Sequence, residues 1–441
     1  MKLRNQIMYS SAYLAVALTT QTVVTWYSYY YAPPEGQGFI SIALIGYALL
    51  IGRVIDAIAD PLVAYWSDNS THEKGRRIPF IKYGSLPLVI IFILIWFPIV
   101  GESSIYNFYY LTIMMCAFFF FFTVVVAPYL ALLPEISPDP DERITISTYQ
   151  SVANILGLIM SSTLAGILID KYGYKAMGIV LGVIALVFFY MPVKVVKEKR
   201  HVRSKNDLGF WVNFHLLLKN KNFVFYQIAN LFLWFTVNML TIAAPYIGGV
   251  LMGLNEQGSG LMLGGTFLTA IATSPLILKL TKRYGKKRIF SITMLMAAAI
   301  LSLIYLIGRP WLFFDAKWFG YTVIALAGVP ISAIFIIPNA IIADITDQDT
   351  FKTGQKRQAM FFGIQGLVSK MVIGLSSWVT LSILFNNYGY NKADPTGIYL
   401  TAPVAAVLCI ISYFTFKYGY NLNEKQVRGI REEISSDELT I

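Results

Sequence analysis

The stretch from Arg53 to Arg77, RVIDAIADPLVAYWSDNSTHEKGRR, begins inside an apolar segment but carries Arg53, Asp56 and Asp60. A helix places these three side chains on one face, because they stand three and four residues apart. A charged side chain at the centre of a membrane helix costs roughly 2.5–3.5 kcal/mol, so such residues are kept where they face an internal cavity and act there. The alternative interpretation is a salt bridge that only ties helices together.

The composition predicts an all-α integral membrane protein. Of 441 residues, 56% are hydrophobic and 13% are charged, whereas a soluble protein carries about 25% charged residues. Apolar spans of about 20 residues recur along the chain, and we expect no cleavable signal peptide. The twelve expected transmembrane helices lie near 8–31, 40–67, 79–100, 106–134, 146–169, 175–194, 222–251, 257–281, 289–308, 317–343, 359–386 and 396–416.

The distribution of Lys and Arg predicts the orientation. Of the 35, 28 fall at the N-terminus, in every second connection between spans and in the tail, five fall in the alternate connections, and two lie within spans. The positive-inside rule therefore predicts a multi-pass protein of the inner membrane with both termini cytoplasmic. The net charge of +11 then needs no nucleic-acid partner. Cys116 and Cys409 lie in predicted spans, and three scattered His residues make no metal site.

An internal repeat predicts two six-helix halves. Asp60-Pro61-Leu62, followed by a basic turn, is echoed by Ser274-Pro275-Leu276, again followed by one. Paired halves around a central cavity describe a transporter of the major facilitator fold. We expect an N-terminal half at 1–194 with the cation site, a cytoplasmic loop at 195–221, a C-terminal half at 222–417 and a cytoplasmic tail at 418–441.

The chain resembles the glycoside–pentoside–hexuronide:cation symporter family, melibiose-carrier type. Its most specific match is the paired Asp56 and Asp60 with the Ser67-Asp68 to Arg77 turn. Matches continue with Pro128-Tyr129, Pro134-Glu135, Glu142-Arg143, Ala343-Asp344-Ile345, Gly354, Arg357, Lys370 and the Tyr420–Glu424 ending.

The resemblance implies a cation site. In the family the corresponding acids bind Na+, Li+ or H+, so Asp56, Asp60 and Thr123 would hold the coupling ion here, while Arg53 and Lys370 would compensate charge. Beyond a possible Na+, no metal and no cofactor is expected. The family's asparagine before the second acid is Ala59 here, which leaves open whether Na+ or a shared proton couples transport.

The sugar-binding positions depart from the family. Its acids, tryptophan and arginine are replaced by Ala17, Val126, Leu130 and Gln150, which argues against a galactoside in the same pose. Aromatic rings and amides can bind a sugar in their place, although any one of them can equally serve packing. The candidate cavity residues are Tyr13, Gln21, Thr25, Trp26, Tyr27, Tyr149, Gln150, Asn154, Trp234, Asn238 and Gln365.

Charged residues at the cytoplasmic ends of spans predict a gate. The candidates are Asp68, Arg76, Arg77, Glu135, Arg143, Asp344 and Arg357. We expect Asp344 and Asp347 to form a solvated pair near the basic 352–357 loop. The alternative for Arg76 and Arg77 is plain positive-inside anchoring, since exposed ion pairs contribute only about 0–1 kcal/mol.

Together these features predict a monomeric symporter that moves a small organic solute, a glycoside or related sugar, with Na+ or H+ by alternating access. One alternative is a carrier of a lysolipid-like or other amphipathic solute, which fits the apolar Val126 and Leu130. An alternative of another class is a membrane enzyme or a sensor that moves no solute. The sequence offers that alternative no nucleotide loop and no nucleophile–base pair, and we expect no enzymatic activity.

Overall fold

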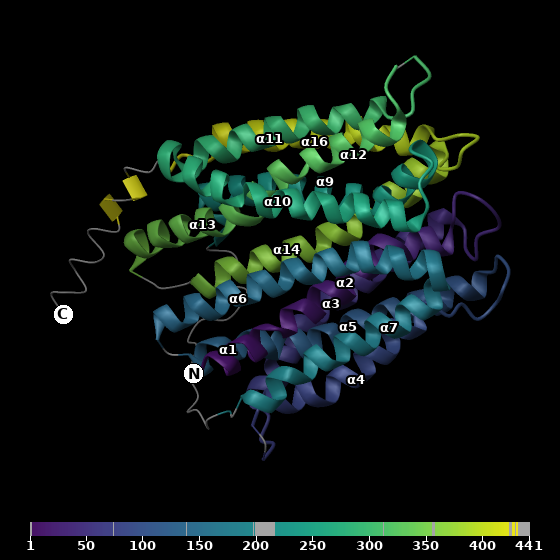
Figure 1. Ribbon diagram of the computed structural model, residues 1–441. Coiled ribbons are helices and arrows are strands. Elements are labelled where there is room, and N and C mark those ends of the chain that lie inside the picture. Colours follow the sequence, from purple (N-terminus) through teal and green to yellow (C-terminus); the bar gives the residue numbers. More distant parts are fainter. Residues whose placement is uncertain are drawn as a thin grey trace. The chain divides into compact units, whose positions relative to one another are not determined.

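The computed structural model (Figure 1) describes residues 2–73, 75–137, 139–196, 198, 217–311, 313–354, 358–422, 426–427 and 429–430. Within this part the secondary structure is helical, as the sequence predicts. Most of the predicted 195–221 loop, most of the tail beyond Leu422, and the gate candidate Arg357 lie outside the described residues. The helices are α1 (Leu3–Ser10), α2 (Ala12–Tyr31), α3 (Ile42–Asn69), α4 (Ile78–Leu94), α5 (Ile105–Ile136), α6 (Pro140–Ile159), η1 (Met160–Leu164), α7 (Ala165–Val195), α9 (Lys221–Tyr246), η2 (Ile247–Leu251), α10 (Glu256–Tyr284), α11 (Lys286–Ser302), η3 (Leu303–Leu306), α12 (Ala316–Leu326), α13 (Gly328–Thr353), α14 (Gln358–Trp378), η4 (Val379–Phe385), α15 (Asn386–Tyr388) and α16 (Thr396–Gly419).

Ten helical segments of the described chain are long and apolar enough to cross a membrane, and Ile78–Leu94 is a shorter apolar helix. One of the ten, Glu142–Val195, has 54 residues, about 80 Å of helix at roughly 1.5 Å per residue, against a hydrocarbon core of about 30 Å. It is interrupted at Gly173, whose φ of 79° is not helical. Division at Gly173 gives one further span and Ile78–Leu94 is the candidate for another, but the count of twelve spans stays a prediction.

The described chain forms two compact units. The first contains Met1–Arg203, Thr241–Phe267 and Ile373–Ile398, and the second contains Ser204–Leu240, Leu268–Val372 and Tyr399–Ile441. The first unit includes all helices of the predicted N-terminal half. The division of the chain into halves at 194 and 222 stays a prediction.

In the first unit, small residues let helices pack closely. Contacts are extensive between α3 and α5, α4 and α5, and α2 and α6, and the first pair runs side by side in Figure 1. Gly52 of α3 lies against Phe119 and Met115 of α5, and a Cβ there would come within 2.9 Å of the Phe119 ring. Small residues at such crossings are how membrane helices associate without a hydrophobic driving force. The close approach positions the charged face of α3 against α5.

In the second unit, α11 packs against α13, and Lys286 pairs with Asp344 across them. Asn222 at the start of α9 donates to Gln348 Oε1 of α13 at 2.9 Å and accepts from the Asn421 backbone N–H at 2.8 Å. The chain after α16 is thereby fixed to the ends of two other helices.

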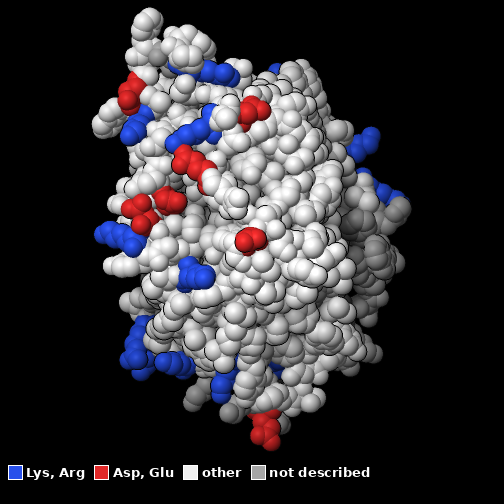
Figure 2. All heavy atoms as spheres, turned by 90° about the vertical axis from the view of Figure 1, so that its right-hand side faces the viewer, with Lys and Arg blue, Asp and Glu red and all other residues white. Residues whose placement is uncertain are grey.

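The surface is mostly uncharged. Figure 2 shows that uncharged residues cover most of the side in view, with acidic and basic side chains near one another among them. Side chains such as Ile113, Val183 and Leu268 are more than half exposed, as suits helices whose outer faces contact lipid.

Candidate functional site

The geometry of α3 and α5 builds the candidate cation site in the first unit. Asp56 and Asp60 lie one helical turn apart on α3, and Thr123 lies on the adjacent α5. Thr123 Oγ1 donates to Asp56 Oδ1 at 2.6 Å and lies 3.4 Å from Asp60 Oδ1. The three residues that the sequence nominates therefore come together around one hydroxyl.

The site is withdrawn from the surface. Asp56 is 0% exposed and Thr123 is 1% exposed, while Asp60 is intermediate. Ala59, which stands where the family has an asparagine, is buried at 2% exposure and brings no side-chain oxygen. Two carboxylates and a hydroxyl are hard oxygen ligands of the kind that small cations prefer. Among the described residues no group of three or more His, Cys, Asp or Glu could hold a metal ion.

Arg53 supplies the positive charge beside the acids. Its Nη1 lies 3.0 Å from Asp56 Oδ2, and its guanidinium stands 3.9 Å from the centroid of the Phe119 ring. Gly374 of α14 lets the backbone approach, because a Cβ there would be 3.1 Å from Arg53 Cβ. Arg53 Nε is buried without a hydrogen-bond partner among the described residues. A buried guanidinium that is incompletely satisfied carries part of the cost of leaving water without compensation.

Lys370 lies on α14 one turn before Gly374 and is partly exposed. The boundary between the two compact units crosses α14 between Val372 and Ile373, so Lys370 belongs to the second unit and Asp56 to the first. Its role as a charge-compensating residue stays a prediction.

The candidate cavity residues of the first unit differ in burial and in the hydrogen bonds that their side chains make. Trp26 is fully buried and its indole N–H donates to the Ser161 carbonyl at 3.0 Å, while the Tyr27 hydroxyl lies 2.6 Å from Ser377 Oγ. Gln150 Nε2 donates to the Tyr129 hydroxyl at 2.8 Å. Tyr13, Gln21, Tyr149 and Asn154 are partly exposed, and Gln21 donates to the buried Thr25 at 3.3 Å. The partly exposed group is better placed to meet a solute than Trp26 or Tyr27.

The remaining cavity candidates belong to the second unit. Trp234 stacks edge-on against Phe335, and its carbonyl accepts from Asn238 Nδ2 at 2.7 Å. Gln365 Oε1 accepts from the Tyr226 hydroxyl at 3.3 Å. Next to Tyr226 on α9, the buried Gln227 has no hydrogen-bond partner for either amide atom among the described residues. The sequence alone does not identify Gln227, because that residue belongs to no motif and nothing in the sequence distinguishes it from the other polar residues of α9.

Four of the five gate candidates of the first unit form one ion-pair network, and Arg143 lies outside it. Arg76 and Arg77 both pair with Glu135 at the end of α5, the second at 2.7 Å, and Arg77 also pairs with Asp68 at 2.8 Å. Arg143 donates to the Ser137 carbonyl at 3.1 Å and binds the turn that follows α5. Arg77 is only 8% exposed, so simple anchoring in solvent does not describe it.

Glu198 completes this network and is absent from the sequence prediction. Its carboxylate accepts the Arg77 and Ile78 backbone N–H groups at 2.9 and 3.3 Å, and lies 3.7 Å from Arg76 Nε. Its side chain is 2% exposed, and it caps the first turn of α4 in the manner of an acidic N-cap. In the sequence Glu198 lies within the charged run VKEKR, which predicts a solvent-exposed segment.

The prediction for Asp344 is wrong in one respect. The expected solvated pair near the 352–357 loop is not observed, because Asp344 is 2% exposed and its partner is Lys286 of α11. A buried carboxylate needs such a partner to offset the cost of leaving water. Asp347, one turn along α13, is partly exposed.

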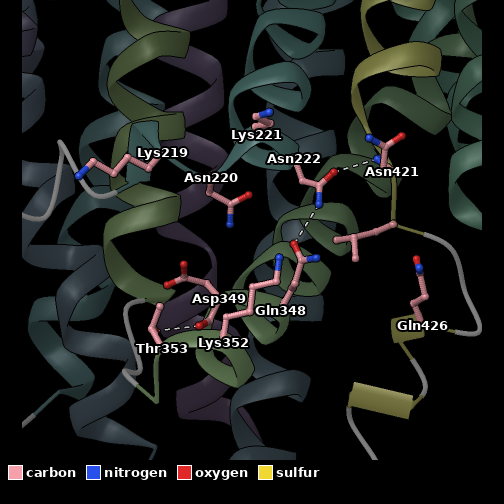
Figure 3. A pocket seen from close by; sticks show the side chains of 11 residues that line it. Lys219, Asn220, Lys221, Asn222, Gln348, Asp349, Lys352, Thr353, Asn421 and Gln426 are labelled. Atoms are coloured by element: carbon pink, nitrogen blue, oxygen red, sulfur yellow. Dashed lines mark hydrogen bonds between the residues drawn. The ribbon is translucent and has the colours of Figure 1, made fainter.

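A polar cavity of 660 Å³ lies at the ends of α9 and α13 in the second unit (Figure 3). Lys219, Lys221, Lys352, Asp349 and several amides line it. Figure 3 shows Asn222 between Gln348 and Asn421, with Lys352 beside Gln348. The sequence did not indicate this cavity, since its residues come from three distant segments.

Buried charged side chains on packed membrane helices are typical of a secondary transporter. Comparison with known proteins also indicates a transporter. The family model for MFS/sugar transport proteins matches residues 8–424. The chain belongs to this family. Its members and the relatives described below are transporters rather than enzymes.

Two relatives and one solved structure illustrate the likeness. The isoprimeverose transporter of Lactiplantibacillus pentosus is 22% identical, with 85% of this chain and 78% of that protein covered. The sodium-dependent lysophosphatidylcholine symporter 1 of Mus musculus is 24% identical, with 88% and 82% covered. A crystal structure of a D-xylose-proton symporter superposes with a TM-score of 0.70 at 13% identity, covering 94% and 97%. The last likeness establishes the major facilitator fold alone.

Proposed function

We propose that the chain is a cation-coupled symporter that moves a glycoside or related sugar across the inner membrane by alternating access. The coupling ion, Na+ or H+, is held by Asp56, Asp60 and Thr123. The observation that carries the proposal is the Thr123 hydroxyl within 2.6 Å of Asp56 and 3.4 Å of Asp60, deep within a membrane-spanning unit. Relatives described as sugar transporters and as a sodium-dependent symporter support both parts of it.

The mechanism follows from linkage. Cation binding neutralises the acids, which otherwise repel each other in a medium of low dielectric. The neutralised site favours the solute, and by reciprocity the solute favours the cation by the same factor. In this mechanism Arg53 releases Asp56 Oδ2 to the ion and restores the pair when the ion leaves, with Lys370 as the second compensating charge.

The gate proposal uses the network around Glu135. Arg76 and Arg77 hold the ends of α3, α4 and α5 together through Asp68, Glu135 and Glu198. Because Arg77 and Glu198 are buried, removal of one partner would leave an uncompensated charge away from water. We also propose that Arg143, Asp344 and Arg357 act at the cytoplasmic surface of a monomeric carrier with twelve spans and both termini cytoplasmic.

Calorimetric titration of the purified full-length protein with Na+ tests the cation site. We expect saturable heat in the wild type and its loss in Asp56→Asn and Asp60→Asn, with an unchanged signal in Glu102→Gln, an exposed carboxylate outside the site. Proton release on Na+ addition, measured at two pH values, separates ion exchange from simple binding. Wild-type heats in both Asp variants would refute the site.

A carrier for an amphipathic solute is the second candidate. Val126 and Leu130 on α5 are apolar where sugar carriers of the family have polar groups, and Leu130 is 45% exposed. The lysophosphatidylcholine symporter relative supports this alternative. Uptake into proteoliposomes, compared between a panel of glycosides and a panel of lysolipids under a Na+ gradient, separates the two candidates.

A further inference from the structure

A further cavity lies in the second unit. It measures 540 Å³ and lies between the start of α11 and the end of α16, and Tyr284 of α10 also lines it. We call it the α11–α16 cleft. Its size falls within the roughly 300–1,000 Å³ typical of small-molecule sites.

The polar end of the cleft is cationic. Lys287, Arg288 and Lys417 line it, together with the hydroxyl-bearing Tyr284 and Tyr413. Lys417 Nζ donates to the Tyr413 hydroxyl at 2.9 Å, and the Arg288 guanidinium stands 5.7 Å from the Tyr284 ring centroid. Among the described residues that line the cleft none is acidic. A compact anion is the complementary ligand, since ammonium and guanidinium groups bind phosphate directly.

The other end of the cleft is apolar and faces outward. Ile292 and Leu295, one and two turns along α11 from Arg288, also line it and are 49% and 42% exposed. On α16 the order is the same, because Ile410, two turns from Lys417, is 39% exposed. Each helix thus presents a cation at its end and bare aliphatic side chains further along.

On both helices the change from cationic to aliphatic side chains falls at the end of a candidate membrane span. Lys287 and Arg288 lie in the first turn of the candidate span Lys286–Leu306, and Lys417 lies in the last turn of Thr396–Gly419. The cations are therefore level with lipid headgroups and the aliphatic residues with acyl chains. Basic pockets between membrane helices at this depth bind anionic headgroups.

We propose that the α11–α16 cleft is a binding site for an anionic phospholipid. The phosphate contacts Arg288 and Lys417, the Tyr284 and Tyr413 hydroxyls bind the glycerol portion, and the acyl chains lie along Ile292 and Leu295. Lys287 contributes less, because its ammonium already donates to the Tyr420 carbonyl.

Native mass spectrometry of the full-length protein tests the site. The protein in detergent is offered phosphatidylglycerol or phosphatidylcholine with identical acyl chains, and retained lipid is counted after washing. We expect preferential retention of phosphatidylglycerol. Each cation at a membrane surface contributes about fivefold in binding, so Arg288→Gln with Lys417→Gln should reduce that preference by roughly 25-fold.

The control removes the same charge elsewhere. Lys279→Gln with Lys282→Gln deletes two exposed cations at the adjacent end of α10 that do not line the cleft. It should keep the wild-type preference. Equal losses in both double variants would mean general attraction to a basic surface and would overturn the site, as would no loss in the cleft variant.

A third variant separates headgroup from chains. Ile292→Gln keeps every charge and should weaken retention of diacyl phosphatidylglycerol while leaving wild-type binding of a short-chain analogue. Binding of inorganic phosphate as tightly as diacyl phosphatidylglycerol would show that the acyl chains contribute nothing and that the cleft takes a free anion, which would overturn the lipid proposal. The melting temperature of each variant, measured in the same detergent, excludes unfolding as the cause of any loss.

Discussion

At the scale of single residues, Thr123 decides how the cluster on α3 is interpreted. A salt bridge between Arg53 and Asp56 would by itself tie nothing beyond one helix, because both residues lie on α3. The Thr123 hydroxyl adds a neutral oxygen from α5 that approaches both acids. A hydroxyl suits a site that alternately holds and releases a cation. Its O–H can donate to a carboxylate when the site is empty, and its lone pairs can accept a hydrogen bond from a protonated carboxyl or coordinate a cation when the site is occupied.

Replacement of Thr123 tests this interpretation. Thr123→Ala removes the hydroxyl and should weaken cation binding by about tenfold or more, corresponding to the loss of one hydrogen-bonding group to charged partners at about 1.5–3 kcal/mol. Thr123→Ser keeps the oxygen and should remain within about twofold of wild type by the same reasoning. Titration with Na+ by calorimetry gives both numbers. If the Ser and Ala variants behave alike, the hydroxyl is not a ligand.

At the scale of elements, the start of α4 depends on a residue more than 120 positions away. The Arg77 backbone N–H donates to Glu198 across 121 residues, and the turn that allows this contains Gly75 at a φ of +108°. A Cβ at position 75 would come within 2.9 Å of Glu198 Cβ. The basic turn is therefore built around a buried acid, and not only around solvent-exposed arginines.

Two glycine substitutions separate backbone strain from this contact. Gly36 has a φ of +94° with open space around it, whereas Gly75 has a similar φ and Glu198 against it. Alanine at either position costs about 1 kcal/mol or more in backbone strain. Gly75→Ala should cost about 0.5–2 kcal/mol beyond Gly36→Ala, because the cap on α4 is also displaced. Thermal melts in detergent compare the two, and equal shifts would contradict the capping role of Glu198.

Local patterns predicted what depends on neighbours in the sequence. The apolar spans and the one-turn spacing of Asp56 and Asp60 follow from helix periodicity, and the described helices lie where expected. Contacts between distant segments escaped prediction: Glu198 reads as part of a solvated charge run, and Asp344 reads as exposed until Lys286 is placed beside it. The hydrogen bond from the Trp26 indole N–H to the Ser161 carbonyl is another contact between distant segments, and no sequence pattern identifies that carbonyl.

At the scale of the whole molecule, the chain combines a transporter's fold with a strong asymmetry of charge. Of 35 Lys and Arg residues, 28 belong to the connections assigned to the cytoplasm. In the proposed orientation this asymmetry is what the positive-inside rule predicts, because basic connections resist translocation across the membrane.

Single-cysteine labelling tests the proposed topology. In a background with Cys116 and Cys409 replaced by serine, Ser103→Cys and Thr71→Cys place exposed thiols in two successive connections. An impermeant maleimide should label position 103 in intact cells and position 71 only after permeabilisation. The reverse pattern would invert the orientation of every span.

The join at Gly173 has a consequence for biogenesis. Helical structure continues from α6 through α7 with a single non-helical residue, flanked by Lys171 and Lys175. In the proposed orientation both lysines must pass through the lipid bilayer during synthesis, where each alone would cost roughly 2.5–3.5 kcal/mol at the midplane. Two apolar helices joined by so short a turn can enter the bilayer together as a hairpin. The favourable insertion free energy of both helices then offsets the cost of moving the two lysines across the membrane. Lengthening this turn with polar residues should therefore impair insertion before it impairs transport.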